Sequence, residues 1–257
     1  MSVRRLLEPY GEEPRQIAEW FLPDREGPPL VILVHGGFWR PVWGMDLEEP
    51  TALDLAAHGF AVVSLEYRSY ENAWPSALID VAAGIDQAID RAPLHGVDPA
   101  RRALLGHSAG GGLALWAASR RSLAGDAPGA DPSAPAFDIV VCHAPVACLE
   151  IGSREHLGEG AIDTFMGGRP EDVPQRYAAC DPHAHLPAPG TRLVLLHGDA
   201  DEDVPMSQSE AYVARVTAHG IDAELVPLPG QGHYEILDPA SEVSGLRRNM
   251  LVEALRP

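Results

Sequence analysis

The chain has 257 residues and a formal net charge of −18, and arginine supplies all of its positive side-chain charge apart from histidine. This length is sufficient for one large domain with a buried core, so we expect a single domain over 1–257. The acidic balance disfavours nucleic acids and anionic membranes as partners.

The beginning of the chain and the cysteine pattern bear on its compartment. Two arginines are followed by only two leucines before Glu8 and Pro9, which does not fit a secretory signal peptide. No apolar run is long enough to span a bilayer. Cys142, Cys148 and Cys180 match neither a disulfide framework nor a metal-ligand spacing. We therefore expect a cytoplasmic protein with reduced thiols.

Strand-like and helix-like segments alternate along the chain. Continuous apolar runs predict buried strands, and apolar residues at helical spacing predict amphipathic helices. In chain order we expect an edge strand at 15–22, a strand at 29–35, a helix near 47–58, a strand at 60–67, a helix at 75–91, a strand ending at 105, a helix beginning near 111, strands at 137–142 and 191–196, a helix at 206–219, a strand at 223–228 and a helix at 240–255. This alternation predicts an α/β fold with a mainly parallel, doubly wound sheet flanked by helices.

The segment at about 146–188 is rich in histidine, proline and glycine and lies between two predicted strands. It shows no regular apolar period, so we expect an irregular segment. Ligands bind at the carboxyl ends of the strands in an open parallel sheet. We therefore predict that this segment forms a small cap over the active site.

The residues Gly106-His107-Ser108-Ala109-Gly110 join a predicted strand to a predicted helix. They form a G-x-S-x-G pattern, whose small residues permit a sharp strand-to-helix turn that exposes the serine hydroxyl above the sheet. A serine hydroxyl is a weak nucleophile unless a neighbouring base removes its proton. The pattern therefore predicts Ser108 as a nucleophile and requires a base, an acid and an oxyanion site elsewhere.

A His-Gly-Gly-Phe-Trp run begins at residue 35, directly after the first buried strand. Its glycines allow the backbone to approach a substrate closely. The N–H groups of Gly37 and Phe38, together with that of Ala109, are the candidate donors of an oxyanion hole. The alternative is a plain tight turn, but the presence of the G-x-S-x-G turn around Ser108 favours the oxyanion site.

The loops after the last two predicted strands supply a candidate acid and a candidate base. Asp199, Asp201 and Asp203 compete for the role of the acid, because spacing from the strand end does not distinguish them. His233 follows the last strand and is the candidate base. The chain order of serine, acid and histidine is the order expected for an exposed serine of this type.

Other histidines suggest structural roles or, in one place, a metal site. His35 and His197 begin His-Gly turns and are expected to brace loops. His183 and His185 form an H-x-H pattern near Asp181. A zinc site needs three or four converging ligands, and no partner cluster accompanies this pattern. We therefore expect no metal and no cofactor.

With these motifs in place, the chain resembles the α/β-hydrolase superfamily over nearly its whole length. The His-Gly-Gly-Phe-Trp and Gly-His-Ser-Ala-Gly-Gly runs are similar to those of the esterase and arylformamidase (kynurenine formamidase) branch, whereas Phe38 replaces the third glycine of the hormone-sensitive-lipase branch. Through the pattern His-Gly-x-x-Asp-x-x-Val-Pro, the resemblance implies Asp201 as the acid. The residues that follow His233 take part in the same resemblance, which implies His233 as the base.

The pocket expected around these residues is aromatic. Trp39, Trp43 and His107 are candidates for lining it, with Phe165 and Met166 contributed by the cap. Ordinary core packing is an equally favoured reading of the large apolar side chains among them, since such side chains are also the usual core fillers.

Three functions remain open from the sequence. The first is a serine esterase that cleaves a small carboxylic ester through a covalent acyl-enzyme, and the second is an arylformamidase that cleaves an aryl formamide. The third is a non-catalytic binding protein on the same fold, which the complete set of Ser108, Asp201 and His233 disfavours. The expected partner is thus a small ester or formamide, and a homodimer is left open.

Overall fold

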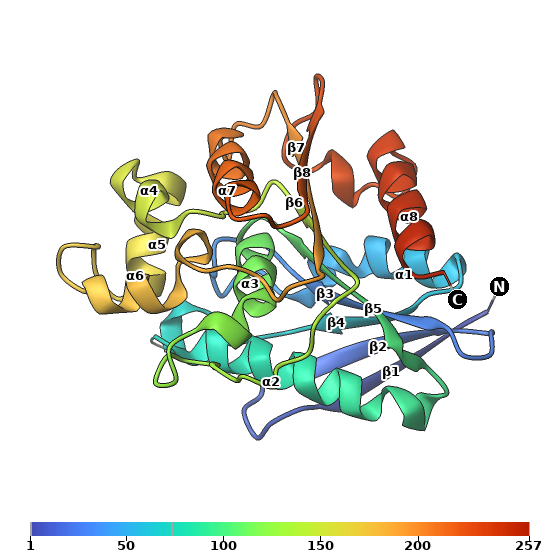
Figure 1. The fold of residues 1–257 in the computed structure, drawn as a ribbon. Coiled ribbons are helices and arrows are strands. Elements are labelled where there is room, and N and C mark those ends of the chain that lie inside the picture. Colours follow the sequence, from blue (N-terminus) through green and yellow to red (C-terminus); the bar gives the residue numbers. More distant parts are fainter. Residues whose placement is uncertain (1, 73, 257) are drawn as a thin grey trace.

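A computed structural model describes residues 2–72 and 74–256 (Figure 1). Its centre is an eight-stranded sheet in the order β1-β2-β4-β3-β5-β6-β7-β8. The first two strands of that order pair antiparallel with each other and β2 pairs antiparallel with β4, whereas the pairs from β4 to β8 are parallel. The strands are β1 (Val3–Pro9), β2 (Ile17–Pro23), β3 (Pro29–Val34), β4 (Ala61–Leu65), β5 (Asp98–His107), β6 (Ile139–His143), β7 (Arg192–Gly198) and β8 (Ala223–Leu228).

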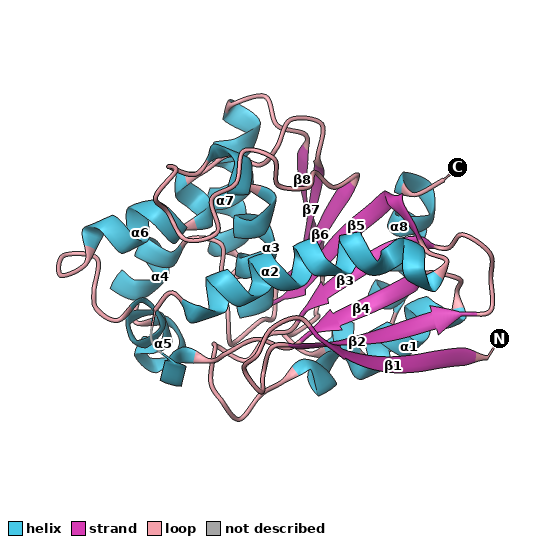
Figure 2. Ribbon diagram, turned by 90° about the horizontal axis from the view of Figure 1, so that it is seen from below, coloured by secondary structure: helices cyan, strands magenta, loops and turns pink. Residues whose placement is uncertain are grey.

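Helices cover both faces of this sheet (Figures 1 and 2). On one face lie α1 (Glu49–Ala57) and α8 (Glu242–Ala254). On the other lie α2 (Ser76–Arg91), α3 (Ala109–Ala118) and α7 (Ser207–Ala218). Both faces need this cover because successive side chains of a strand point to opposite faces. In the central strand β3, Ile32 packs into one hydrophobic cluster, and Val31 and Leu33 pack into the other. The predicted mainly parallel, doubly wound α/β sheet is thus confirmed.

The prediction of an edge strand at 15–22 is wrong in its position. β2 lies between β1 and β4, and β1 forms the edge. β1 was not predicted, because its residues are exposed or half-buried along its whole length and it therefore carries no apolar run.

The segment at 146–188 is more regular than expected. It contains three short helices, α4 (Leu149–Arg154), α5 (Leu157–Met166) and α6 (Pro174–Cys180). These helices have six, ten and seven residues, and helices this short depend on tertiary packing more than on intrinsic propensity. A sequence pattern therefore carries little signal for them. Across the described residues, no helix is both long and apolar enough to cross a membrane.

Candidate active site

The turn between β5 and α3 places Ser108 at the carboxyl end of the sheet. Ser108 has a φ of 56° and a ψ of −122°, a backbone conformation that is unfavourable for a residue with a side chain. Its N–H donates to the carbonyl of His143 over 2.8 Å, and its own carbonyl accepts from the N–H groups of Gly112 and Val146. These backbone hydrogen bonds hold the serine in its strained conformation.

The glycines on either side of this turn are required by close backbone contacts. A Cβ atom on Gly106 would lie 2.3 Å from the carbonyl oxygen of Gly110. A Cβ atom on Gly110 would lie 2.1 Å from the carbonyl oxygen of Val34 in β3. Both distances are far shorter than a van der Waals contact, so the G-x-S-x-G spacing allows the strand, the turn and the helix to pack together.

We expect Gly110→Ala to lower the free energy of unfolding by about 3 kcal/mol, because the new methyl group overlaps backbone that cannot move aside cheaply. Gly125→Ala is the matched control, since a Cβ atom there meets nothing within 4 Å. It should change stability by less than about 0.5 kcal/mol. Urea denaturation of both variants measures the difference, and equal midpoints would contradict the packing argument.

His233 and Asp201 are joined by a hydrogen bond. Nδ1 of His233 lies 2.6 Å from Oδ2 of Asp201, and both side chains are nearly inaccessible to solvent. The other carboxylate oxygen of Asp201 accepts the N–H groups of Asp203 and Val204 at 2.9 and 2.8 Å. Burial raises the pKa of Asp201, but the bonds from His233 and Val204 outweigh burial and hold its pKa below the ordinary value. The carboxylate is therefore ionised and oriented toward the imidazole.

The other two candidate acids have different surroundings. Asp199 is exposed and accepts the N–H of Gly230 over 2.6 Å, which ties the loop after β7 to the loop after β8. Asp203 lines the pocket without a hydrogen bond to His233 in the described part of the chain. Nε2 of His197 donates to the backbone carbonyl of Val204 and Nδ1 is hydrogen-bonded to the hydroxyl of Ser209, as expected for a residue that braces a loop.

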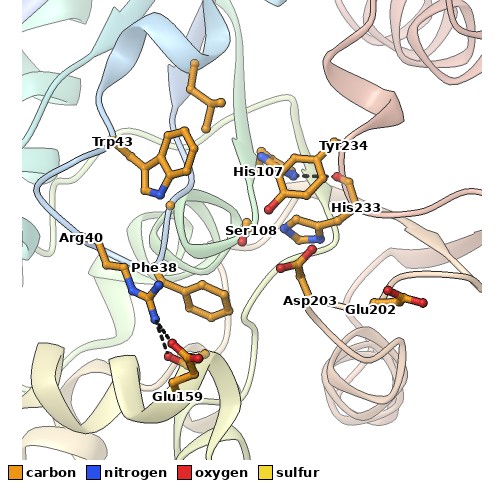
Figure 3. Close-up of a pocket in the computed structure, with 13 residues that line it drawn as sticks. Phe38, Arg40, Trp43, His107, Ser108, Glu159, Glu202, Asp203, His233 and Tyr234 are labelled. Atoms are coloured by element: carbon orange, nitrogen blue, oxygen red, sulfur yellow. Dashed lines mark hydrogen bonds and ion pairs between the residues drawn. The ribbon is translucent and has the colours of Figure 1, made fainter.

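Ser108 and His233 face the same cavity, as Figure 3 shows. Among the described residues, no hydrogen bond joins the hydroxyl of Ser108 to the imidazole of His233. Such catalytic hydrogen bonds are often long before substrate binds. The geometry thus brings together the three side chains that the sequence singled out, with the bond between Asp201 and His233 formed and none between Ser108 and His233 among the described residues.

The loop after β3 has the strained backbone expected for a donor loop. The φ angles of Gly37, Phe38 and Trp39 are 105°, 49° and 55°. Within the described residues, no acceptor is found for the N–H groups of Gly37 and Phe38. Tyr67 braces the loop, because its hydroxyl donates to the carbonyl of His35 over 2.8 Å and its ring stacks on the imidazole of His35. The N–H of Ala109, in the first turn of α3, has no acceptor within its own helix.

The cavity above Ser108 has a volume of about 420 Å³. It contains two of the five residues proposed for the pocket, Trp43 and His107. Its lining residues are Gly37, Phe38, Arg40, Trp43, Leu47, His107, Ser108, Gly158, Glu159, Glu202, Asp203, His233 and Tyr234. The cavity therefore combines aromatic walls with charged side chains (Figure 3).

The prediction that Trp39, Phe165 and Met166 line this cavity is wrong. Trp39 is 2% exposed and stacks on Phe165 with ring centroids 4.2 Å apart. Met166 is fully buried in the same hydrophobic cluster. The two rings join the loop after β3 to α5, so these side chains belong to the core that supports the site.

The segment 146–188 contributes to the cavity through two neighbouring residues. Gly158 and Glu159 line the cavity, and Arg40 donates to the carbonyl of Gly158 and to the carboxylate of Glu159 at 3.0 and 3.1 Å. These residues and Tyr234, which also lines the cavity, were not predicted from the sequence. A charged residue in a loop has no periodic pattern, and only the fold brings it to the site.

The H-x-H pattern has structural partners. His185 is hydrogen-bonded to the carbonyl of Ala178, and the carboxylate of Asp181 accepts the N–H groups of Leu149, Glu150 and His183. Within the described residues, the one group of three side chains close enough to share a metal ion is Asp201, Asp203 and His233. Two of these three are already hydrogen-bonded to each other.

The sheet order, the flanking helices and the serine at the end of β5 define an α/β-hydrolase fold. A carbohydrate esterase from gut microbiota has the same fold, with a TM-score of 0.85 at 20% identity, covering 100% of this chain and 97% of that one. The chain belongs to the BD-FAE family of α/β-hydrolase esterases, whose model matches residues 20–216.

Curated relatives are also esterases by name. The chain is 28% identical over 248 residues to a probable isoprenylcysteine alpha-carbonyl methylesterase of Oryza sativa, covering 88% of this chain and 56% of the relative. It is 28% identical over 260 residues to esterase LipQ of Mycobacterium tuberculosis, covering 96% of this chain and 60% of the relative. The chain therefore spans less than two thirds of the length of these relatives.

Proposed function

We propose that this protein is a serine carboxylesterase that hydrolyses small carboxylic esters. The observation that carries the proposal is the hydrogen bond between Asp201 and His233, whose imidazole shares a cavity with Ser108. In the described part of the chain, the N–H groups of Gly37 and Phe38 in the lining of this cavity have no acceptor. The family and the names of the relatives support the same class of reaction.

The proposed first step forms an acyl-enzyme. Nε2 of His233 takes the proton of the Ser108 hydroxyl while Oγ bonds to the ester carbonyl carbon. Gly37, Phe38 and Ala109 donate their N–H groups to the resulting oxyanion. Collapse of the tetrahedral intermediate breaks the bond to the alcohol oxygen, which leaves with the proton from His233.

The proposed second step releases the acid. His233 takes a proton from water while the water oxygen bonds to the acyl carbon. The bond between that carbon and Oγ of Ser108 then breaks. The proton then returns to Oγ, so the enzyme is regenerated. Asp201 holds the imidazole in the tautomer with hydrogen on Nδ1 and stabilises the imidazolium in both steps.

Labelling by a fluorophosphonate probe tests the nucleophile directly. We expect labelling of the wild type at the peptide that contains Ser108, and none in Ser108→Ala. Ser207→Ala is the matched control, because Ser207 is an exposed serine of α7 outside the cavity. An unlabelled wild type would instead favour a non-catalytic binding protein.

The second candidate substrate is an aryl formamide. Its basis is the sequence resemblance around Trp39 and after His233, and the burial of Trp39 removes that side chain from the cavity wall. We therefore place the small ester first. Parallel assays on p-nitrophenyl acetate and N-formylkynurenine separate the two, and much faster formamide turnover would reverse the order.

A further inference from the structure

His107 contacts His233, the proposed base, through its ring. Its side chain is buried at the end of β5, and its Nε2 lies 3.0 Å from the backbone carbonyl oxygen of His233. The two imidazole rings are also in contact, with centroids 4.6 Å apart (Figure 3). Because a carbonyl oxygen only accepts, Nε2 of His107 must carry the hydrogen of this bond.

The other ring nitrogen of His107 faces a buried carboxyl group. Nδ1 lies 3.7 Å from Oε1 of Glu48, a residue at the end of the short helix Met45–Glu48. Neither atom has a hydrogen-bond partner among the described residues, and Glu48 is only 4% exposed. At this separation the two atoms are close but not hydrogen-bonded, and two buried polar atoms are costly when each presents only a lone pair to the other.

The protonation of this pair follows from the hydrogen on Nε2 of His107 and from the closeness of its Nδ1 to the carboxyl group of Glu48. A neutral His107 with hydrogen on Nε2 has a lone pair on Nδ1. An ionised Glu48 would oppose that lone pair with another, whereas a protonated Glu48 has a hydrogen to donate. Burial raises the pKa of Glu48 despite the opposing charge of Arg247, and burial lowers the pKa of His107 to about 3. Both shifts agree with two neutral side chains.

We propose that His107 and Glu48 are positioning residues for His233: a protonated Glu48 orients the ring of His107, which in turn holds the backbone carbonyl of His233. This inference rests on the proposed function of His233 as the base. The loop around His233 contains Gly230 and Gly232, so its backbone has few constraints of its own. With the Asp201 bond on the side chain and the His107 bond on the backbone, His233 is held at two points.

The kinetic test compares two neutral replacements of His107. His107→Leu removes the donor, and His107→Gln keeps an N–H group near the place of Nε2. We expect the Leu variant to lower kcat about tenfold, because a small displacement of the base slows both chemical steps. The loss should be larger in kcat than in KM, because the bond from His107 acts on the position of the base, although its side chain also lines the cavity. The Gln variant should recover most of the lost kcat.

His95→Leu is the matched control, because His95 is a nearly buried histidine that packs on Trp20, outside the lining of the cavity. It should leave kcat unchanged whatever it costs in stability. Equal kcat for the Leu and Gln variants of His107, or a loss confined to KM, would overturn the positioning role.

A spectroscopic test is independent of turnover and needs no variant of His107 to fold. In wild-type protein labelled with ¹⁵N-histidine, we expect His107 as the neutral tautomer with hydrogen on Nε2 at neutral pH. The infrared difference spectrum between wild type and Glu48→Gln should contain the carbonyl band of a protonated carboxyl group. A carboxylate band would overturn the role of Glu48. If esterase activity is absent but both signatures are present, the proposed function fails while the buried pair stands.

Discussion

Ser108→Ala is expected to lower kcat on p-nitrophenyl acetate by about 10⁴- to 10⁶-fold, because no other group is placed to form the acyl-enzyme. Alanine has the same Cβ atom as serine and therefore bears a similar penalty at the φ of 56°, so the variant should fold with a nearly unchanged KM. The remaining activity over water would come from the oxyanion donors and from substrate binding.

Ser207→Ala provides the control in the same assay, since Ser207 is exposed on α7. It should retain wild-type kcat and KM. Turnover of Ser108→Ala within tenfold of wild type, with the fold verified by circular dichroism, would exclude the serine mechanism.

Asp201→Asn is expected to lower kcat by about 10⁴-fold. The asparagine amide can donate to Nδ1 of His233, which favours the imidazole tautomer with hydrogen on Nε2 and removes the lone pair that must accept the serine proton. The loss should therefore appear in kcat, with little effect on KM.

Two neighbouring carboxylates serve as matched controls for Asp201. Asp199→Asn retains an acceptor for the N–H of Gly230, and Asp203→Asn changes the charge of the cavity wall without removing the bond to His233. We expect each to lower kcat by less than about tenfold, since neither touches the tautomer of the base. A loss at Asp203 as large as that at Asp201 would reassign the acid.

The choice among these three aspartates shows where sequence reasoning stops. Asp199, Asp201 and Asp203 follow the same strand within five residues, and all three lie close to the loop that follows β8. The structure distinguishes them by contacts across some thirty positions of the chain: Asp201 bonds to His233, and Asp199 bonds to Gly230. From the residues alone these contacts were not accessible, and only resemblance to known enzymes pointed to Asp201.

The exposure of the aromatic residues is a second feature that the sequence alone does not determine. Trp39 and Trp43 lie four positions apart in one loop, yet Trp39 is 2% exposed and Trp43 is 43% exposed at the cavity. Trp39 stands in a left-handed turn with Phe38 and packs into the core, whereas Trp43 lines the cavity. Composition and spacing carry no information about that turn.

The sequence by itself determined the features that depend on neighbouring residues. Apolar runs predicted the parallel strands, and the glycines around Ser108 predicted a sharp turn, because both follow from local sterics and solvation. The tertiary structure decided which loop residues meet: the partner of His233, the residues that line the cavity, and the contact between His107 and Glu48. These are contacts between segments far apart in the chain, and they exist only after the sheet has brought the ends of its strands together.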